Sequence, residues 1–225
     1  YHDDAVRTLA SRVIPSAGSD HSLVVSTLAW AQPPKEAGPP ATCLGAGARA
    51  DGIAYVLDAR AATAKLLPAA VAGVRASLAG LDERQRFVAV AHPHPPGQRP
   101  GGAPVLATEA ARRRAGRFLD AVEPAGRSDP LPALVRAIRA LDGAGGAAAA
   151  VFFLSDGRFA DPAALRAGLR SANLGPAVRI HAVLLHAGEP DPAAAEAMRA
   201  IAAQHRGTFR AVQVATLARR DEDGG

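Results

Sequence analysis

Cysteine, aromatic residues and long apolar runs are all scarce in this chain. The single cysteine, Cys43, excludes an intramolecular disulfide and a multi-cysteine metal centre, and it favours a reducing compartment such as the cytoplasm. No apolar run approaches the roughly 20 residues that a membrane-spanning helix needs. Aromatic residues make up only 4% of the chain, so we expect a core of Ala, Val and Leu. Because Tyr1 is not an initiator residue, the presence of an upstream signal or anchor stays undecided, and the localisation of the protein is therefore also undecided.

The motifs of common enzyme classes are missing as well. The sequence contains no Gly-x-Ser-x-Gly elbow, no P-loop and no His-Glu-x-x-His. Ser155 precedes an aspartate, but no histidine is predictably near it to act as a base. His92 and His94 lie in a Pro- and Gly-rich loop without a nearby carboxylate or thiol, which makes them weak metal ligands. A hydrolase-like or transferase-like α/β enzyme is therefore the less favoured alternative.

The positive charge is modest and is mostly arginine. A net charge of +5 results from 26 basic and 21 acidic residues. The densest cluster is Arg112, Arg113 and Arg114 with Arg117, on a predicted helix that has no interleaved aromatic side chains to stack on bases. Nucleic-acid binding is not expected. The cluster is interpreted as a solvated helix face, with a surface for a phosphate or an acidic partner as the alternative.

Three segments can be distinguished along the 225 residues. Residues 1–51 form an N-terminal extension, residues 52–216 a domain, and residues 217–225 a charged tail. Within the extension, apolar residues at helical spacing predict a helix over residues 3–14. Residues 22–30 are β-prone, and four prolines in AQPPKEAGPP predict a linker. The run from Gly45 to Arg49 resembles half of a dinucleotide-binding loop, but it precedes a strand instead of following one.

Strands and helices alternate through the domain. Asp-Pro pairs at 129–130, 161–162 and 191–192 predict three helix starts, and Thr108 a fourth, because Asp and Thr cap helices and Pro suits the first turn. A heptad-like apolar stripe predicts a further helix over residues 64–81. The pattern predicts an α/β fold, a doubly wound, mostly parallel sheet of about six strands between helical layers, with Rossmann-like topology. Strands are expected at residues 53–57, 86–91, 104–107, 151–154, 178–185 and 208–214.

Two of these strands end in an aspartate. Asp58 closes the apolar strand at 53–57, and Asp156 follows the strand at 151–154. In open parallel sheets, sites form beyond the carboxyl ends of the strands. The two carboxylates are therefore expected to lie in one site.

Three passages, in this order, resemble the von Willebrand factor type A (vWA) domain. They are IAYVLDARAA at 53–62, Gly126-Arg127-Ser128-Asp129 before a helix, and VFFLSDGRFAD at 151–161. The resemblance covers roughly residues 50–215 and implies a three-layer αβα sandwich with a Mg²⁺-dependent adhesion site. Asp58, Ser128 and Asp156 match the family's ligands, whereas Arg60 and Ala62 stand where the family has two serines.

This departure predicts a degenerate site. We expect Arg60 to bridge Asp58 and Asp156 and to replace the ion, since its planar fork suits carboxylates; the alternative is that Arg60 points into solvent. The favoured function is a non-catalytic, metal-independent module for protein association that needs no cofactor. A subunit of a larger assembly is one form that such a module can take. A Mg²⁺-dependent binder that uses Asp58, Ser128 and Asp156 stays as the alternative.

Overall fold

The computed structural model describes residues 6–15, 22–30, 38–93, 102–126, 129–142, 148–173 and 178–214, the first two ranges by their backbone alone. Contacts divide the chain into two compact units, residues 1–36 and residues 37–225. Each is described by itself.

The smaller unit is a two-stranded antiparallel ribbon. Strand β1 (Val6–Pro15) pairs with β2 (Ser22–Trp30), and the register shifts between Thr8 and Ala10. The helix predicted over residues 3–14 is therefore wrong, whereas the β-prone segment 22–30 is a strand. Val, Ile and Thr are stiff at their first side-chain torsion and favour extended backbone, and here they outweigh the helical spacing of the apolar residues.

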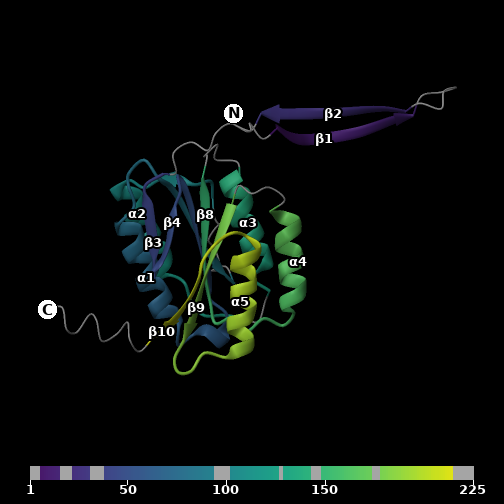
Figure 1. Ribbon diagram of the computed structural model, residues 1–225. Coiled ribbons are helices and arrows are strands. Elements are labelled where there is room, and N and C mark those ends of the chain that lie inside the picture. The colour runs from purple at the N-terminus through teal and green to yellow at the C-terminus, as the bar shows by residue number, and fades with distance from the viewer. Residues whose placement is uncertain are drawn as a thin grey trace. The chain divides into compact units, whose positions relative to one another are not determined.

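The larger unit is built on a six-stranded sheet with the order β10-β9-β8-β5-β6-β7 (Figure 1). All neighbouring pairs are parallel except β6 and β7, which are antiparallel. The mostly parallel α/β sheet expected from the sequence is confirmed. The strands are β5 (Gly52–Asp58), β6 (Arg86–His92), β7 (Val105–Leu106), β8 (Ala149–Ser155), β9 (Val178–His186) and β10 (Phe209–Gln213).

Helices cover both faces of the sheet, and their starts follow the expected caps. The side chains of Thr108, Asp161 and Asp191 accept hydrogen bonds from backbone N–H groups of the first turns, and Asp129 Oδ1 accepts one from Leu131 N at 2.9 Å. The helices are α1 (Leu67–Ala79), α2 (Glu109–Asp120), α3 (Leu131–Asp142), α4 (Pro162–Ala172) and α5 (Pro192–Gln204), and a 3₁₀ turn (Ala61–Thr63) precedes α1.

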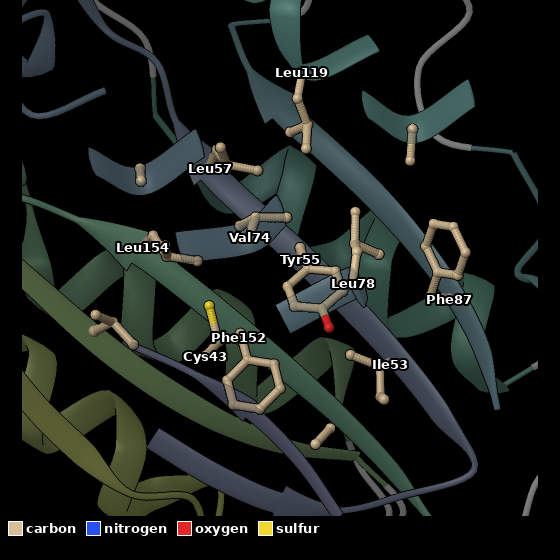
Figure 2. Close-up of a cluster of buried hydrophobic side chains, with 14 of the residues drawn as sticks. Cys43, Ile53, Tyr55, Leu57, Val74, Leu78, Phe87, Leu119, Phe152 and Leu154 are labelled. Carbon is tan, nitrogen blue, oxygen red and sulfur yellow. The ribbon is translucent and has the colours of Figure 1, made fainter. Parts of the chain in front are cut away.

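Two buried clusters, one on each face, give the sandwich three layers. Helices α3, α4 and α5 pack on one face, and α1 and α2 pack on the other. Figure 2 shows the second cluster, where Tyr55 stacks on Phe152 with ring centroids 5.7 Å apart. The Tyr55 hydroxyl is hydrogen-bonded to Ser77 at 2.7 Å. These residues form a close-packed apolar floor beneath the loops at the carboxyl ends of the strands.

A hairpin shares the second face with α1 and α2. Strands β3 (Pro40–Cys43) and β4 (Ala46–Arg49) are joined by Leu44 and Gly45, both at positive φ, as a two-residue turn with this twist requires. Cys43 is fully buried, and burial raises the pKa of its thiol to about 12. The boundary expected at residue 51 thus falls inside the larger unit. The run from Gly45 to Arg49 is part of a hairpin and has no phosphate-binding geometry.

His181 is a core residue of this face. Its ring lies 5.3 Å from the ring of Phe152, and its Nδ1 accepts a hydrogen bond from Thr208 N at 3.2 Å. Burial lowers the pKa of His181 to about 4. The residue is 3% exposed, and its Nε2 has no hydrogen-bond partner among the described residues.

Candidate binding site at the carboxyl ends of β5 and β8

The candidate site lies where the chain changes direction across the sheet. From β5 the chain continues to β6 on one side and later returns to β8 on the other. Strands β5 and β8 are parallel neighbours, with Leu57 opposite Leu154. Loops that leave such a pair at the carboxyl ends form a crevice, which is where open α/β sheets bind ligands. Asp58 and Asp156 therefore meet in space although 98 positions separate them in the sequence.

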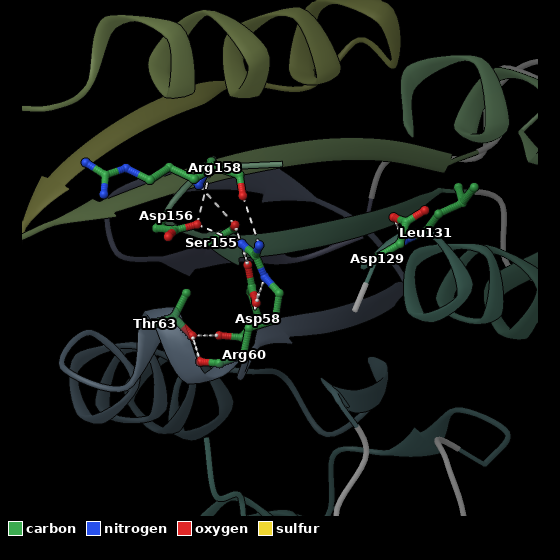
Figure 3. A network of polar contacts seen from close by, with 9 residues as sticks. Asp58, Arg60, Thr63, Asp129, Leu131, Ser155, Asp156 and Arg158 are labelled. Carbon is green, nitrogen blue, oxygen red and sulfur yellow. Dashed lines mark hydrogen bonds and ion pairs between the residues drawn. The ribbon is translucent and has the colours of Figure 1, made fainter. Parts of the chain in front are cut away.

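Arg60 bridges the two aspartates (Figure 3). Its Nε donates to Asp58 Oδ1 at 2.8 Å, and its Nη2 donates to Asp58 Oδ2 at 2.6 Å and to Asp156 Oδ1 at 2.8 Å. Its Nη1 donates to the carbonyl oxygen of Arg158 at 2.9 Å. The bridge expected from the sequence is present, and the alternative in which Arg60 points into solvent is wrong.

Local hydrogen bonds hold both carboxylates in place. Ser155 Oγ donates to Asp58 Oδ2 at 2.7 Å and accepts from Gly157 N at 3.1 Å. Asp156 Oδ1 also accepts from Arg158 N at 3.1 Å. Gly157 has φ +72°, and a Cβ added there would lie 2.7 Å from the carbonyl oxygen of Ala194. The sharp turn after β8 therefore needs glycine.

The cluster is largely removed from water. Side-chain exposure is 0% for Asp58, 10% for Asp156 and 12% for Arg60. The hydrogen bonds to Asp58 are the main cause that raises the pKa of the Arg60 guanidinium above its ordinary value. Because one cation faces two carboxylates, the formal charge of the cluster is −1. The Arg60 guanidinium carbon also lies 5.9 Å from the centroid of the Phe159 ring.

Several solved structures resemble this chain. A protein described as von Willebrand factor type A from Catenulispora acidiphila has a TM-score of 0.62 at 20% identity, over 75% of this chain and 40% of that chain. BatB, a conserved hypothetical protein from Bacteroides thetaiotaomicron, has a TM-score of 0.55 at 14% identity, over 76% and 97%. The pilus adhesin SpaC from Lactobacillus rhamnosus GG, in its open conformation, has a TM-score of 0.61 at 11% identity, over 97% and 33%. No family model matches the chain, and no curated protein does.

The chain has a von Willebrand factor type A-like fold. The three-layer architecture expected from the sequence resemblance is confirmed.

The donor set of this vWA-like site does not fit the Mg²⁺ ion that the fold family implies. Magnesium requires near-octahedral oxygen ligands at about 2.1 Å. Here the carboxylate oxygens of Asp58 and Asp156 accept hydrogen bonds from a guanidinium, which would also repel a divalent cation. Arg60 and Ala62 offer no hydroxyl at the two serine positions of the family. Within the described residues, no group of three or more His, Cys, Asp or Glu side chains could hold a metal ion.

Other residues singled out from the sequence lie elsewhere or play other parts. Ser128 and His94 lie outside the described residues. On α2, Arg112 Nη2 donates to the carbonyl oxygen of Leu81 at 2.6 Å, and Arg113 forms an ion pair with Glu109. Two residues of the predicted basic surface thus have partners within the chain. Arg114 and Arg117 are both exposed on the same helix. No helix in the described part of the chain is long and apolar enough to cross a membrane.

Two residues of the site escaped the sequence reasoning. Thr63 Oγ1 lies 2.8 Å from the carbonyl oxygens of both Asp58 and Arg60, which ties the 3₁₀ turn back to the end of β5. Phe159 stacks on Phe153 with ring centroids 5.9 Å apart and underlies the guanidinium. The sequence did contain a signal for Thr63, because this threonine closely follows the Asp-x-Arg turn at residues 58–60. It contained no signal for Phe159, because the position of that ring depends on tertiary packing.

Beside the bridge lies an open cavity of about 490 Å³. It is bounded by the turn after β5, the segment before α3 and the loop between β8 and α4. Its lining consists of Arg60, Ala62, Gly126, Asp129, Pro130, Arg158, Phe159, Ala160, Asp161 and Ala164.

Proposed function

We propose that the chain is a protein-interaction module of vWA type that uses an internal arginine in place of a metal ion. The observation that carries the proposal is the bridge from Arg60 to Asp58 and Asp156, with all three donor–acceptor distances between 2.6 and 2.8 Å. A cation that is part of the chain permanently offsets one of the two carboxylate charges. The surrounding loops then keep their binding conformation at any metal concentration.

Protein association is supported by the position of the cavity and by the neighbouring folds. The cavity opens at the loop end of a rigid sheet, where recognition residues commonly lie. One of the similar structures is described as a pilus adhesin, SpaC. The chain corresponds to only 33% of that protein, so a role as one module of a larger assembly is part of the proposal.

The module is proposed to be non-catalytic. Ser155, whose hydroxyl contacts a carboxylate of the bridge, is 2% exposed, and its Oγ is bound to Asp58 and Gly157. A serine nucleophile needs an adjacent base that can accept its proton and an open path to substrate. Asp58 is already committed to Arg60.

Thermal unfolding with Mg²⁺ and Mn²⁺ tests metal independence. A ligand that binds only the native state must raise the melting temperature. For each protein, the unaltered chain and the Asp156→Ala variant, we expect the melting temperature with metal ions to equal that with a chelator. A metal-dependent rise that disappears in Asp156→Ala would show that the site binds an ion and would overturn the proposal.

Site-directed photo-crosslinking tests the interaction face. A photoreactive amino acid replaces Ala62, which is exposed at the cavity, or in the control Ala203, which is exposed near the end of α5. We expect a defined protein adduct in cells from position 62 and not from position 203. Equal adducts from both positions, or none from either, would contradict binding through this face.

A further inference from the structure

The described arginines that line the cavity have few hydrogen-bond donors left to offer. Four contacts engage all but one of the N–H groups of the Arg60 guanidinium. The other arginine of the lining, Arg158, is directed elsewhere: its Nε pairs with Asp191 Oδ2 at 3.4 Å, and Figure 3 shows its side chain pointing away from Asp129. An acidic ligand would therefore find little to bind.

Two carboxylates of the cavity lining have no ion-pair partner among the described residues. Asp129 and Asp161 are exposed, and each caps a helix with its Oδ1, to Leu131 N at 2.9 Å and to Ala164 N at 2.8 Å. Neither forms an ion pair within the part of the chain that the structure describes. Each carboxylate carries a full negative charge, whereas the helix N-terminus it caps supplies only about half a positive charge.

The charges of the described residues thus add up to a negative cavity. The bridge contributes −1, the two capping aspartates −2, and the pair of Arg158 with Asp191 nothing. The N-termini of α3 and α4 offset about half a charge each, which leaves about −2. A vWA site that holds Mg²⁺ between the same two carboxylates would carry one positive charge more. The replacement of the ion by arginine therefore makes the site one charge more negative.

The remaining lining suits an aliphatic stem. The Phe159 ring, Pro130 and three alanines provide apolar contacts between the bridge and the capping aspartates. Long basic side chains place their methylene groups on apolar surface and keep the charged head beside carboxylates or over an aromatic face.

We propose that the partner inserts a lysine or arginine side chain into this cavity, with its charge between Asp129 and Asp161 and its stem on Phe159. The inference rests on the proposed function and specifies the chemistry of the partner, opposite to the carboxylate that a metal-bearing site would take.

Titration of the full chain with N-acetyl-arginine amide and N-acetyl-glutamate amide, followed by amide NMR shifts, tests the inference. We expect saturable shifts at residues 129–130 and 158–164 with the arginine amide at millimolar concentrations, without metal. Asp129→Asn and Asp161→Asn should each weaken binding about fivefold, as expected for one exposed ion pair. Asparagine caps helices as well as aspartate, so both variants should keep the fold.

Glu189→Gln serves as the matched control, because it removes one exposed carboxylate in the loop after β9, outside the cavity lining. Its affinity for the arginine amide should be unchanged. Absence of saturable shifts, or equal affinity in all three variants, would overturn the inference. Binding of the glutamate amide without metal would overturn it and leave the proposed function intact. Binding of the glutamate amide only in the presence of Mg²⁺ would overturn both.

Discussion

Removal of the internal cation should destabilise the fold strongly. In Arg60→Ala, Asp58 would keep a fully buried carboxylate. Among the described residues, its remaining donors would be Ser155 Oγ at 2.7 Å and the backbone N of residue 60 at 3.2 Å. Asp156, 10% exposed, would lose its bond to Nη2. Breaking a buried pair by deleting one partner costs about 3–5 kcal/mol, because the other charge stays buried without compensation. Since Arg60 and Asp156 retain some contact with water, we expect about 3 kcal/mol, at the lower end of this range.

Urea unfolding of both variants at neutral pH, followed by circular dichroism, measures this loss. Arg158→Ala is the matched control. Arg158 follows the end of the neighbouring strand β8, but its side chain is 69% exposed and pairs with Asp191 at the longer distance of 3.4 Å. An exposed pair of this kind contributes less than about 1 kcal/mol. Arg60→Lys should fall between the two, because an ammonium cannot reproduce the planar fork. If Arg60→Ala lost no more stability than Arg158→Ala, the bridge would not be neutralising buried charge and the reasoning would be refuted.

Three further outcomes can be measured by the same unfolding assay. Burial lowers the pKa of His181 from 6.5 to about 4, so the unfolded chain takes up the proton first as pH falls. Stability should be complete above pH 6.5 and about 2 kcal/mol lower at pH 5, and His181→Asn should lack this part of the pH dependence. Tyr55→Phe should cost about 1 to 2 kcal/mol, because it leaves the buried Ser77 hydroxyl without its partner; a neutral result would argue against that bond. Gly157→Ala should cost about 2 kcal/mol or more, from left-handed backbone and a clash with Ala194. A Gly157→Ala variant as stable as the parent chain would contradict the turn geometry.

Much of the larger unit could be predicted from local sequence. Aspartate followed by proline marks a helix start whatever surrounds it, because the cap bonds the first turn of its own helix. The bridge was predictable for a related reason. Arg60 lies two residues from Asp58, and parallel strands bring the ends of β5 and β8 together once the strand order is known.

The conformations of strand β1 and of the hairpin formed by β3 and β4 depend on which strands pair with each other. The apolar spacing of residues 3–14 fits a helix as well as a strand, and only the register of β1 against β2 distinguishes them. Strands β3 and β4 are four residues each, too short to be recognised by alternation. A positive φ at Leu44 was not predictable either, because it is imposed by the turn that joins two paired strands.

The sequence by itself thus determined the alternation of strands and helices, the helix starts, and the residues at the two strand ends. These depend on contacts within a few residues, or on the alternation of apolar and polar side chains. Only the tertiary structure decided that Phe159 lies beneath Arg60 and that Arg158 turns outward to Asp191. Those orientations follow from packing between segments 33 to 99 positions apart, and they help to set the charge and the apolar surface of the cavity.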